Sequence, residues 1–161
     1  MSARAILYAV LAALAACSPI SADAGQTAAA AGPARHPTSG LEVVPLTIVS
    51  ANGRHAFRVE AARSEPEQAK GLMFRTEMGA DEGMIFPMEP ARQASFWMKN
   101  TVMSLDLVFV GPDKRIESIA ANAVPYSLSP IGSRGSVSAV LELNGGRAAQ
   151  LGLAPGDRVD W

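Results

Sequence analysis

Two stretches of alternating apolar and polar residues, 41–50 and 55–62, follow one another in the middle of the chain. The dipeptide Asn52-Gly53 between them is typical of a two-residue β-hairpin turn, because both turn positions need positive φ. A loop at these residues gathers apolar side chains on one face of the hairpin and polar side chains on the other, so we predict a hairpin with one buried face. The apolar pairs are Ile48–Phe57, Leu46–Val59 and Val44–Ala61, and the polar pairs are Thr47–Arg58 and Glu42–Arg63.

Short helices are predicted at two places. Ser64-Glu65-Pro66-Glu67 has the pattern of a capping box, in which the serine hydroxyl and the glutamate carboxylate each accept a hydrogen bond from the other's backbone amide. We expect this helix to end near Gly71, because glycine commonly follows the last residue of a helix. Asn144 is expected to cap a second helix over residues 145–151, which Gly152 ends.

Further strands are predicted where short apolar or alternating stretches are bounded by turn residues. They lie at residues 84–86, 95–99, 105–110, 115–121 and 137–143, with a last strand ending at Trp161. The alternation within residues 137–143 places Glu142 on the solvent face of its strand. Many short strands with only two short helices are typical of a small antiparallel β-sandwich or jelly-roll-like barrel. We therefore predict a mainly β domain.

The first residues have the pattern of an export signal. One positive charge in residues 1–4 precedes an apolar stretch, residues 5–13, which is too short to span a bilayer. Small residues then lead to Cys17 in the sequence Leu14-Ala15-Ala16-Cys17, which matches a bacterial lipobox. We expect residues 1–17 to be a lipoprotein signal peptide with its lipobox, and Cys17 to carry a lipid that anchors the protein to a membrane.

Serine rather than aspartate at position 18 favours the outer membrane over the inner membrane. The alternative is an ordinary signal peptide cut near Ala22-Asp23-Ala24, which would release a soluble periplasmic protein. Residues 18–40 are rich in Ala, Pro, Gly and Ser, so we predict a disordered tether in which His36 is a solvated linker residue. Residues 41–161 then form a single domain.

The composition excludes several classes of function. The formal net charge is −1 and Lys and Arg form no run, so a nucleic-acid partner is not expected. A single cysteine can form neither an internal disulfide nor a structural zinc site. Neither His36 nor His55 lies beside a nucleophile motif, which argues against a Ser-His-Asp mechanism. We predict no cofactor and no bound metal.

Five sequence blocks follow one another in the order and spacing of the domain-of-unknown-function family DUF192, which the chain resembles over residues 41–161. The blocks are GLMFR (71–75), EGMIF (82–86), FWMKNT (96–101), LDLVFV (105–110) and VLEL (140–143). The resemblance implies a small β-sandwich or jelly-roll-like fold in a family common among exported prokaryotic proteins, with no established biochemical activity. Many members have proline where this chain has Ser104, a difference that we expect to loosen a turn.

The densest group of polar and aromatic residues is Trp97 to Thr101. On an extended segment Trp97 and Lys99 share one face, so that an aromatic surface lies beside a hydrogen-bond donor. Arg75 follows an apolar stretch and could add a second cation, and Asp106 lies within an apolar strand, where a carboxylate needs a partner or a function. Arg75, Trp97, Lys99, Asn100 and Asp106 thus predict a pocket for a small polar or anionic ligand.

A structural interpretation explains the same residues and stays open. In it, Arg75 or Lys99 pairs with Asp106, Asn100-Thr101 forms a tight turn, and Trp97 fills the core. Since no catalytic motif is present, we expect a non-catalytic module that binds a small ligand or an envelope protein, and we lean against an enzyme.

Two other functions remain as alternatives. The first is an envelope hydrolase that uses carboxylates together with Lys99; the candidate carboxylates are Asp81, Glu82, Asp106 and Glu142. The second, weaker alternative is copper handling, because thioethers suit Cu(I) and six methionines lie within thirty-one residues. They are Met73, Met78, Met84, Met88, Met98 and Met103. Methionine is also a common core filler, and no closely spaced methionine pair occurs among them.

Overall fold

The computed structural model describes residues 34–161, so the predicted signal peptide, Cys17 and most of the predicted tether lie outside the described residues. The elements, in chain order, are β1 (Val43–Ser50), β2 (Gly53–Ala61), α1 (Glu65–Lys70), β3 (Glu82–Arg92), β4 (Ser95–Phe96), β5 (Leu105–Val110), β6 (Ile116–Ala123), β7 (Ile131–Gly132), β8 (Val137–Asn144), α2 (Arg147–Leu151) and β9 (Arg158–Asp160). Within residues 34–161 neither helix is long and apolar enough to cross a bilayer.

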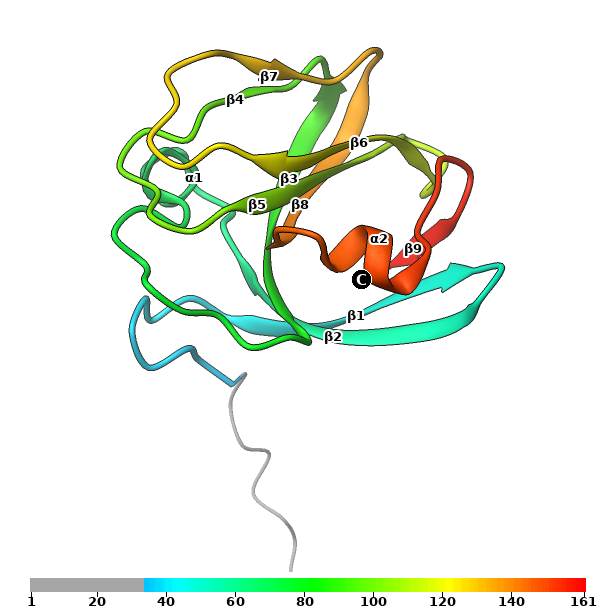
Figure 1. Ribbon diagram of the computed structural model, residues 1–161, viewed down its shortest axis with the longest axis horizontal. Helices are drawn as coiled ribbons and strands as arrows, with labels where there is room; N and C mark the ends of the chain where they lie inside the picture. Colours follow the sequence, from blue (N-terminus) through cyan, green and yellow to red (C-terminus); the bar gives the residue numbers. More distant parts are fainter. Residues whose placement is uncertain (1–33) are drawn as a thin grey trace, which may run out of the picture. The chain divides into compact units, whose positions relative to one another are not determined.

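Seven strands form one mixed sheet in the order β6-β5-β8-β3-β2-β1-β9, and β4 pairs with β7 in a separate two-stranded sheet (Figure 1). The pairing of β2 with β3 is parallel, because α1 carries the chain between them as a crossover, and every other strand pair is antiparallel. One isolated bridge, between Arg115 and Arg158, links the two ends of the large sheet without closing it into a barrel. The prediction of a mainly β, sandwich-like domain with two short helices is confirmed.

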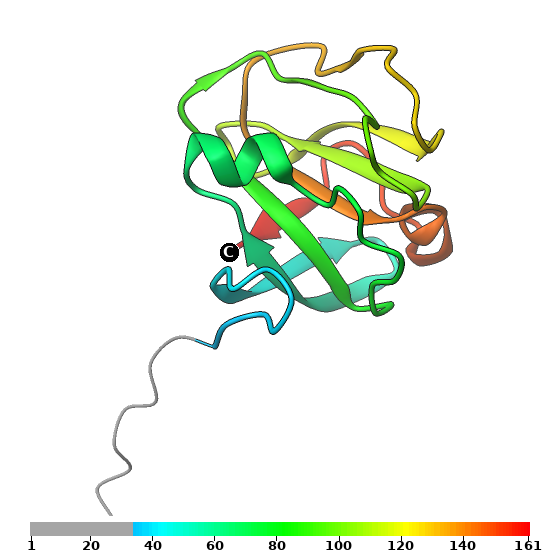
Figure 2. The same ribbon diagram turned by 90° about the vertical axis from the view of Figure 1, so that its left-hand side faces the viewer.

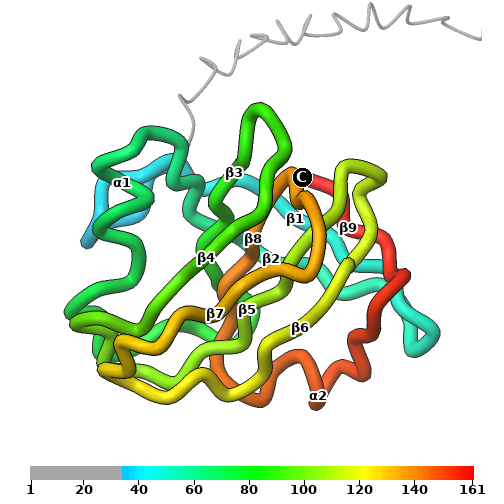
Figure 3. The backbone as a smooth tube through the Cα atoms, turned by 90° about the horizontal axis from the view of Figure 1, so that it is seen from above, coloured from blue at the N-terminus to red at the C-terminus, as the bar shows by residue number. Residues whose placement is uncertain are grey.

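The central strands β3, β5 and β8 are buried on both faces, and all six residues of β5 are buried. One face of these strands packs inside the curve of the large sheet, in a core cluster that includes Ile48, Phe57 and Leu141. The other face carries a second core cluster around Phe86 and Phe109. Figure 3 shows β4 and β7 crossing over this part of the sheet, and Figure 2 shows α1 between β4 and residues 34–42. A polar side chain on the second face of β8 is therefore buried beneath another layer.

The β1–β2 hairpin has the predicted faces but another register. Ile48 pairs with His55 and Leu46 with Phe57, so the loop is Ala51-Asn52 and the predicted pairing is wrong by two residues. Because side chains alternate with a period of two, this shift keeps the apolar residues on the buried face. The Asn52 amide donates to Ser50 Oγ at 3.1 Å and its side chain donates to the carbonyl of Leu151 at 3.3 Å. This contact with α2, distant in sequence, lies at the turn itself.

The capping box at the start of α1 is confirmed, with Glu67 Oε2 accepting a hydrogen bond from the Ser64 amide at 2.8 Å. The cap predicted for α2 is wrong, because Gly146, with φ of 83°, occupies the N-cap position. Asn144 instead donates to the carbonyls of Met78 and Gly79 at 2.9 and 3.0 Å. The amides at the start of α2 donate to Asp106, as described below.

Residues 34–40, at the end of the predicted tether, form hydrogen bonds with the domain. The amide of Val43 donates to the Ala34 carbonyl at 2.7 Å. The side chain of His36 is only 17% exposed and lies 3.6 Å from Glu60 Oε1, so its interpretation as a solvated linker residue is wrong. Arg75 shares this contact, since its Nη1 lies 3.4 Å from His36 Nε2. The carboxylate of Glu60 on β2, which contacts His36 and Arg75, therefore holds residues 34–40 against the domain.

Candidate ligand-binding cavity

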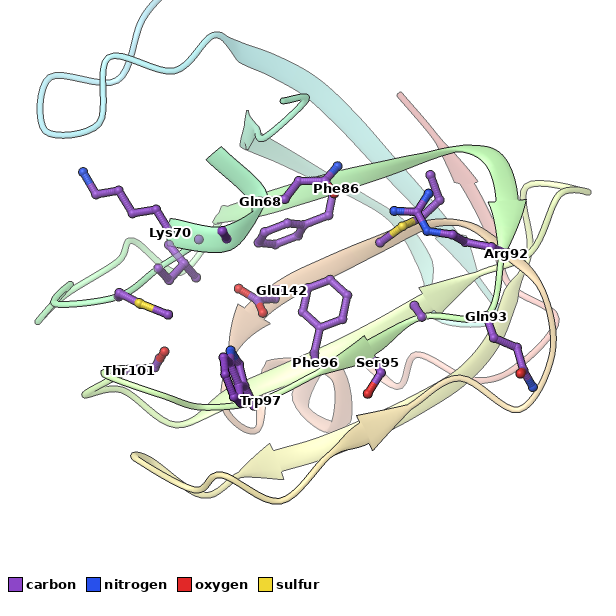
Figure 4. Close-up of a pocket in the computed structure, with 16 residues that line it drawn as sticks. Gln68, Lys70, Phe86, Arg92, Gln93, Ser95, Phe96, Trp97, Thr101 and Glu142 are labelled. Carbon is purple, nitrogen blue, oxygen red and sulfur yellow. The ribbon is translucent and has the colours of Figure 1, made fainter. Parts of the chain in front are cut away.

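A cavity of about 400 Å³ opens between α1 with its following turn, β3, and the segment from Gln93 to Thr101 (Figure 4). The lining includes buried members of the second core cluster, such as Leu72 and Phe86, and the exposed Trp97, so the cavity extends from that core to the surface. The lining residues are Gln68, Ala69, Lys70, Gly71, Leu72, Met73, Phe86, Met88, Arg92, Gln93, Ala94, Ser95, Phe96, Trp97, Thr101 and Glu142.

Three aromatic rings form much of the wall. Phe86 of β3 and Phe96 of β4 meet edge to face, with ring centroids 5.1 Å apart and an angle of 83° between the planes. Trp97 follows directly after β4 and is 51% exposed, so its ring is available at the entrance. Lys99 Nζ lies 5.2 Å from the centre of the Trp97 ring, a cation–π distance. The wall thus presents aromatic surfaces to the cavity, and polar side chains such as Gln68, Ser95 and Thr101 lie among them.

Glu142 places a carboxyl group inside this aromatic wall. The residue lies on β8 between Met84 of β3 and Leu107 of β5, and it is 5% exposed. Figure 4 shows the carboxyl group in the middle of the cavity, between the rings of Phe86, Phe96 and Trp97. Burial raises the pKa of Glu142 to about 8, and no hydrogen bond or charge within residues 34–161 opposes this effect. The protein itself supplies no partner, and at neutral pH the group is mostly protonated.

Cationic and amide side chains lie toward the edges of the cavity. Lys70 at the end of α1 and Arg92 at the end of β3 are at its periphery in Figure 4. Gln68 donates to the carbonyls of Ala62 and Pro87 at 3.2 and 2.9 Å, which ties α1 to the strands on either side of it. These hydrogen bonds from the Gln68 side chain to the backbone hold α1 in place, and Glu142 takes no part in them.

The structure does not assemble the five predicted site residues into one pocket. Trp97 alone of the five lines the cavity, and Lys99 lies over its ring. The predicted strand 95–99 ends at Phe96, and the chain then turns at Asn100, whose φ is 55°. The side chain of Asn100 donates to Met73 Sδ at 3.8 Å. Asn100 thus supports the turn beside the cavity.

Arg75 and Asp106 have structural partners of their own. Arg75 Nη2 donates to both carboxylate oxygens of Glu60, at 2.9 and 3.0 Å. Asp106 is completely buried and accepts three backbone hydrogen bonds, from Asn122 at 2.8 Å, Gly146 at 3.0 Å and Ala148 at 2.8 Å. The proposed pairing of Asp106 with a cation is therefore wrong, because backbone amides satisfy this carboxylate.

The methionines are mostly core residues. Met84, Met88 and Met98 are buried in the second core cluster, and Met78 and Met103 pack against it from its edge. Met73 lines the cavity. Within residues 34–161 no group of three or more His, Cys, Asp or Glu side chains is arranged to hold a metal ion. The positions of the methionines are explained by packing.

The sequence suggested Glu142 only as a candidate carboxylate of the hydrolase alternative, and not as a residue of the predicted pocket, because alternation assigned one face of residues 137–143 to solvent. That assignment fails when a strand is central and both of its faces are covered. The neighbouring strands carried a usable signal, since residues 84–86 and 105–110 are almost continuously apolar, as in strands buried on both sides. A glutamate on a strand between them is buried, and its carboxyl group then needs a partner.

Comparisons with known proteins agree with this fold. The model of the family DUF192, Uncharacterized ACR, matches residues 47–161. The chain is similar to a crystal structure of a protein of unknown function from Novosphingobium aromaticivorans, with a TM-score of 0.79 and 59% sequence identity over 82% of this chain and 94% of that chain. It is also similar to a crystal structure from Sinorhizobium meliloti, of a protein proposed to be a transcription regulator. Here the TM-score is 0.72 and the identity 40%, over 74% of this chain and 94% of that chain.

The search of curated proteins finds no match. The crystallised chain from Novosphingobium aromaticivorans is little longer than the region that matches this chain. Because the matched region makes up 94% of that crystallised chain, a polypeptide scarcely longer than this domain folds by itself.

Proposed function

The chain belongs to the uncharacterised DUF192 family, and from that premise we propose that its domain is a non-catalytic module that binds a small molecule in the Glu142 cavity. The observation that carries the proposal is the carboxyl group of Glu142, which projects from a central strand into the cavity and forms no hydrogen bond or ion pair with another described residue. A carboxyl group that burial holds largely protonated, and that faces a cavity, is typical of functional sites. A ligand would supply the missing partner.

The size and lining of the cavity support a small molecule. About 400 Å³ lies within the range of roughly 300–1,000 Å³ that is usual for small-molecule pockets, and aromatic side chains are common in the lining of such pockets. Among the described lining residues Glu142 is the only acidic one, whereas hydrolysis by paired carboxylates needs two of them flanking the substrate. Binding is therefore better supported than the hydrolase alternative.

We test this function with a thermal-shift screen of residues 34–161 against metabolites, peptidoglycan fragments and lipids. A ligand at about 100 times its dissociation constant stabilises the folded state by roughly 2.7 kcal/mol, which raises Tm by several degrees. Replacing Trp97 or Glu142, as in Trp97→Ala and Glu142→Gln, is expected to weaken binding at least tenfold. Tyr126→Ala, which removes an exposed aromatic side chain that does not line the cavity, is the control. Hits that bind both cavity variants unchanged would contradict the proposal.

We also propose that the domain is held at the envelope by a lipid on Cys17, with the outer membrane favoured over the inner. Only the sequence supports this part of the proposal. In a bacterium that processes lipoproteins, the wild-type chain is expected to incorporate labelled palmitate and to sediment with membranes. Cys17→Ser should abolish both, whereas Ser18→Ala should leave labelling intact. Palmitate labelling that persists in Cys17→Ser would contradict the lipid assignment.

A further inference from the structure

We infer that the Glu142 cavity selects an organic ammonium group, a primary or alkylated amine carried on a small apolar body. This inference rests on the proposed function and names the ligand class of the same site. The combination of an acidic side chain with aromatic rings is the feature that points to it. Both kinds of group attract cations, and both reach the same space in Figure 4.

Three aromatic rings lie where they can stabilise a cation. Phe86, Phe96 and Trp97 surround the Glu142 carboxyl group. An ammonium group near an aromatic face is stabilised by the ring quadrupole, and this attraction grows when water is excluded. The molecule already shows this interaction on Trp97, where Lys99 Nζ lies 5.2 Å from the ring centre. Since Lys99 already lies over Trp97, the rings of Phe86 and Phe96 are the further aromatic surfaces that a ligand cation would contact.

The carboxyl group of Glu142 has no counter-charge among the described residues. Lys70 from α1 and Arg92 from β3 are the other charged residues of the lining, and neither offsets the effect of burial on this carboxyl group. An ammonium ion beside the carboxylate would supply the absent counter-charge. Binding then converts the protonated acid to a carboxylate and releases its proton to water, so no covalent step is involved.

Two other ligand classes fit the geometry less well. A neutral hydrogen-bond acceptor would use the protonated acid as a donor and would make no use of the aromatic cation-binding surface. An anionic ligand would need Lys70 or Arg92, which lie at the periphery and not in the aromatic centre of the cavity. The three classes also differ in their expected pH dependence, which makes them separable by experiment.

The test uses residues 34–161 and three probes of similar shape, benzylamine, benzyl alcohol and benzoate, with affinities measured by calorimetry at pH 6 and pH 8. Benzyltrimethylammonium is added as a cation whose charge does not change with pH. We expect both cations to bind at least tenfold more tightly at pH 8 than at pH 6, because the carboxylate is then available. Measurement in two buffers of different ionisation enthalpy should show release of close to one proton per bound cation at pH 6.

Variants separate the ligand class from the existence of the site. Glu142→Gln should weaken cation binding at least tenfold and remove its pH dependence, while Lys70→Gln should retain that dependence; circular dichroism checks folding. Equal or tighter binding of benzyl alcohol or benzoate, lost in Trp97→Ala, would overturn the ammonium inference and keep the proposed function. If all four probes fail to bind at 10 mM and the thermal-shift screen gives no hit, both the ammonium inference and the proposed function are overturned.

Discussion

Glu142→Gln is expected to make the domain more stable than the wild type at pH 8, and to remove a loss of stability that the wild type undergoes between pH 5 and pH 8. The pKa of Glu142 is raised from 4.5 to about 8 in the folded state by burial. Between these two values the unfolded chain has released the proton and the folded chain retains it. Stability therefore falls as pH rises, and the loss is complete just above pH 8.

The expected size of this loss of stability follows from the shift in the pKa of Glu142. A single group with these two pKa values changes the free energy of unfolding by about 1.4 kcal/mol per pH unit, and by about 5 kcal/mol at most over the whole range. Urea unfolding at pH 5, 6, 7 and 8 measures it as the difference between wild type and variant. Other groups titrate in both proteins and cancel in that difference.

Glu77→Gln is the matched control, because it makes the same substitution at an exposed position. Its difference from the wild type is expected to stay constant with pH. A constant difference for Glu142→Gln as well would show that the carboxyl group is not held protonated in the folded state. If Glu142→Gln gains stability at pH 8 but loses ligand binding, the residue is retained for function at the expense of stability, as is common for functional sites.

Asp106→Asn is expected to destabilise the domain by roughly 3 kcal/mol at pH 7, and Asp106→Ala by more. Asp106 Oδ1 accepts hydrogen bonds from the amides of Asn122 and Gly146, and Oδ2 accepts one from Ala148. Asparagine keeps one oxygen but places an NH₂ group where an amide donor approaches, so a buried donor loses its acceptor. Such losses amount to about 1–3 kcal/mol for each buried group.

Urea unfolding measures the stability, and hydrogen exchange at the Gly146 and Ala148 amides locates the effect at the start of α2. Asp113→Asn is the control, because Asp113 accepts a backbone hydrogen bond at 3.1 Å in an exposed turn. Its effect is expected to stay below about 1 kcal/mol, as is usual for exposed sites. Since Asp106 does not line the cavity, ligand affinity should be unchanged in Asp106→Asn. Full stability of this variant would contradict the structural role.

Local patterns in the sequence were sufficient wherever the deciding interactions are close along the chain. The capping box around Ser64 and Glu67 involves residues three positions apart, and it forms as predicted. The strand at Leu105–Val110 was recognised from its own apolar residues. The faces of the first hairpin were also predictable, since alternation alone determines which side chains point the same way. Family membership followed from short blocks with specific spacing.

Long-range contacts decided the features on which function depends. The hairpin register depends on a turn that contacts Leu151, about a hundred positions away. Asp106 and Glu142 look alike in sequence, as acids within apolar strands, yet backbone amides satisfy Asp106 and leave Glu142 alone in an aromatic cavity. The sequence by itself determined the β-rich domain and its local elements, because these depend on periodicity and turn chemistry. Only the tertiary structure decided which acid is a site residue, because that depends on which layer covers each face of the sheet.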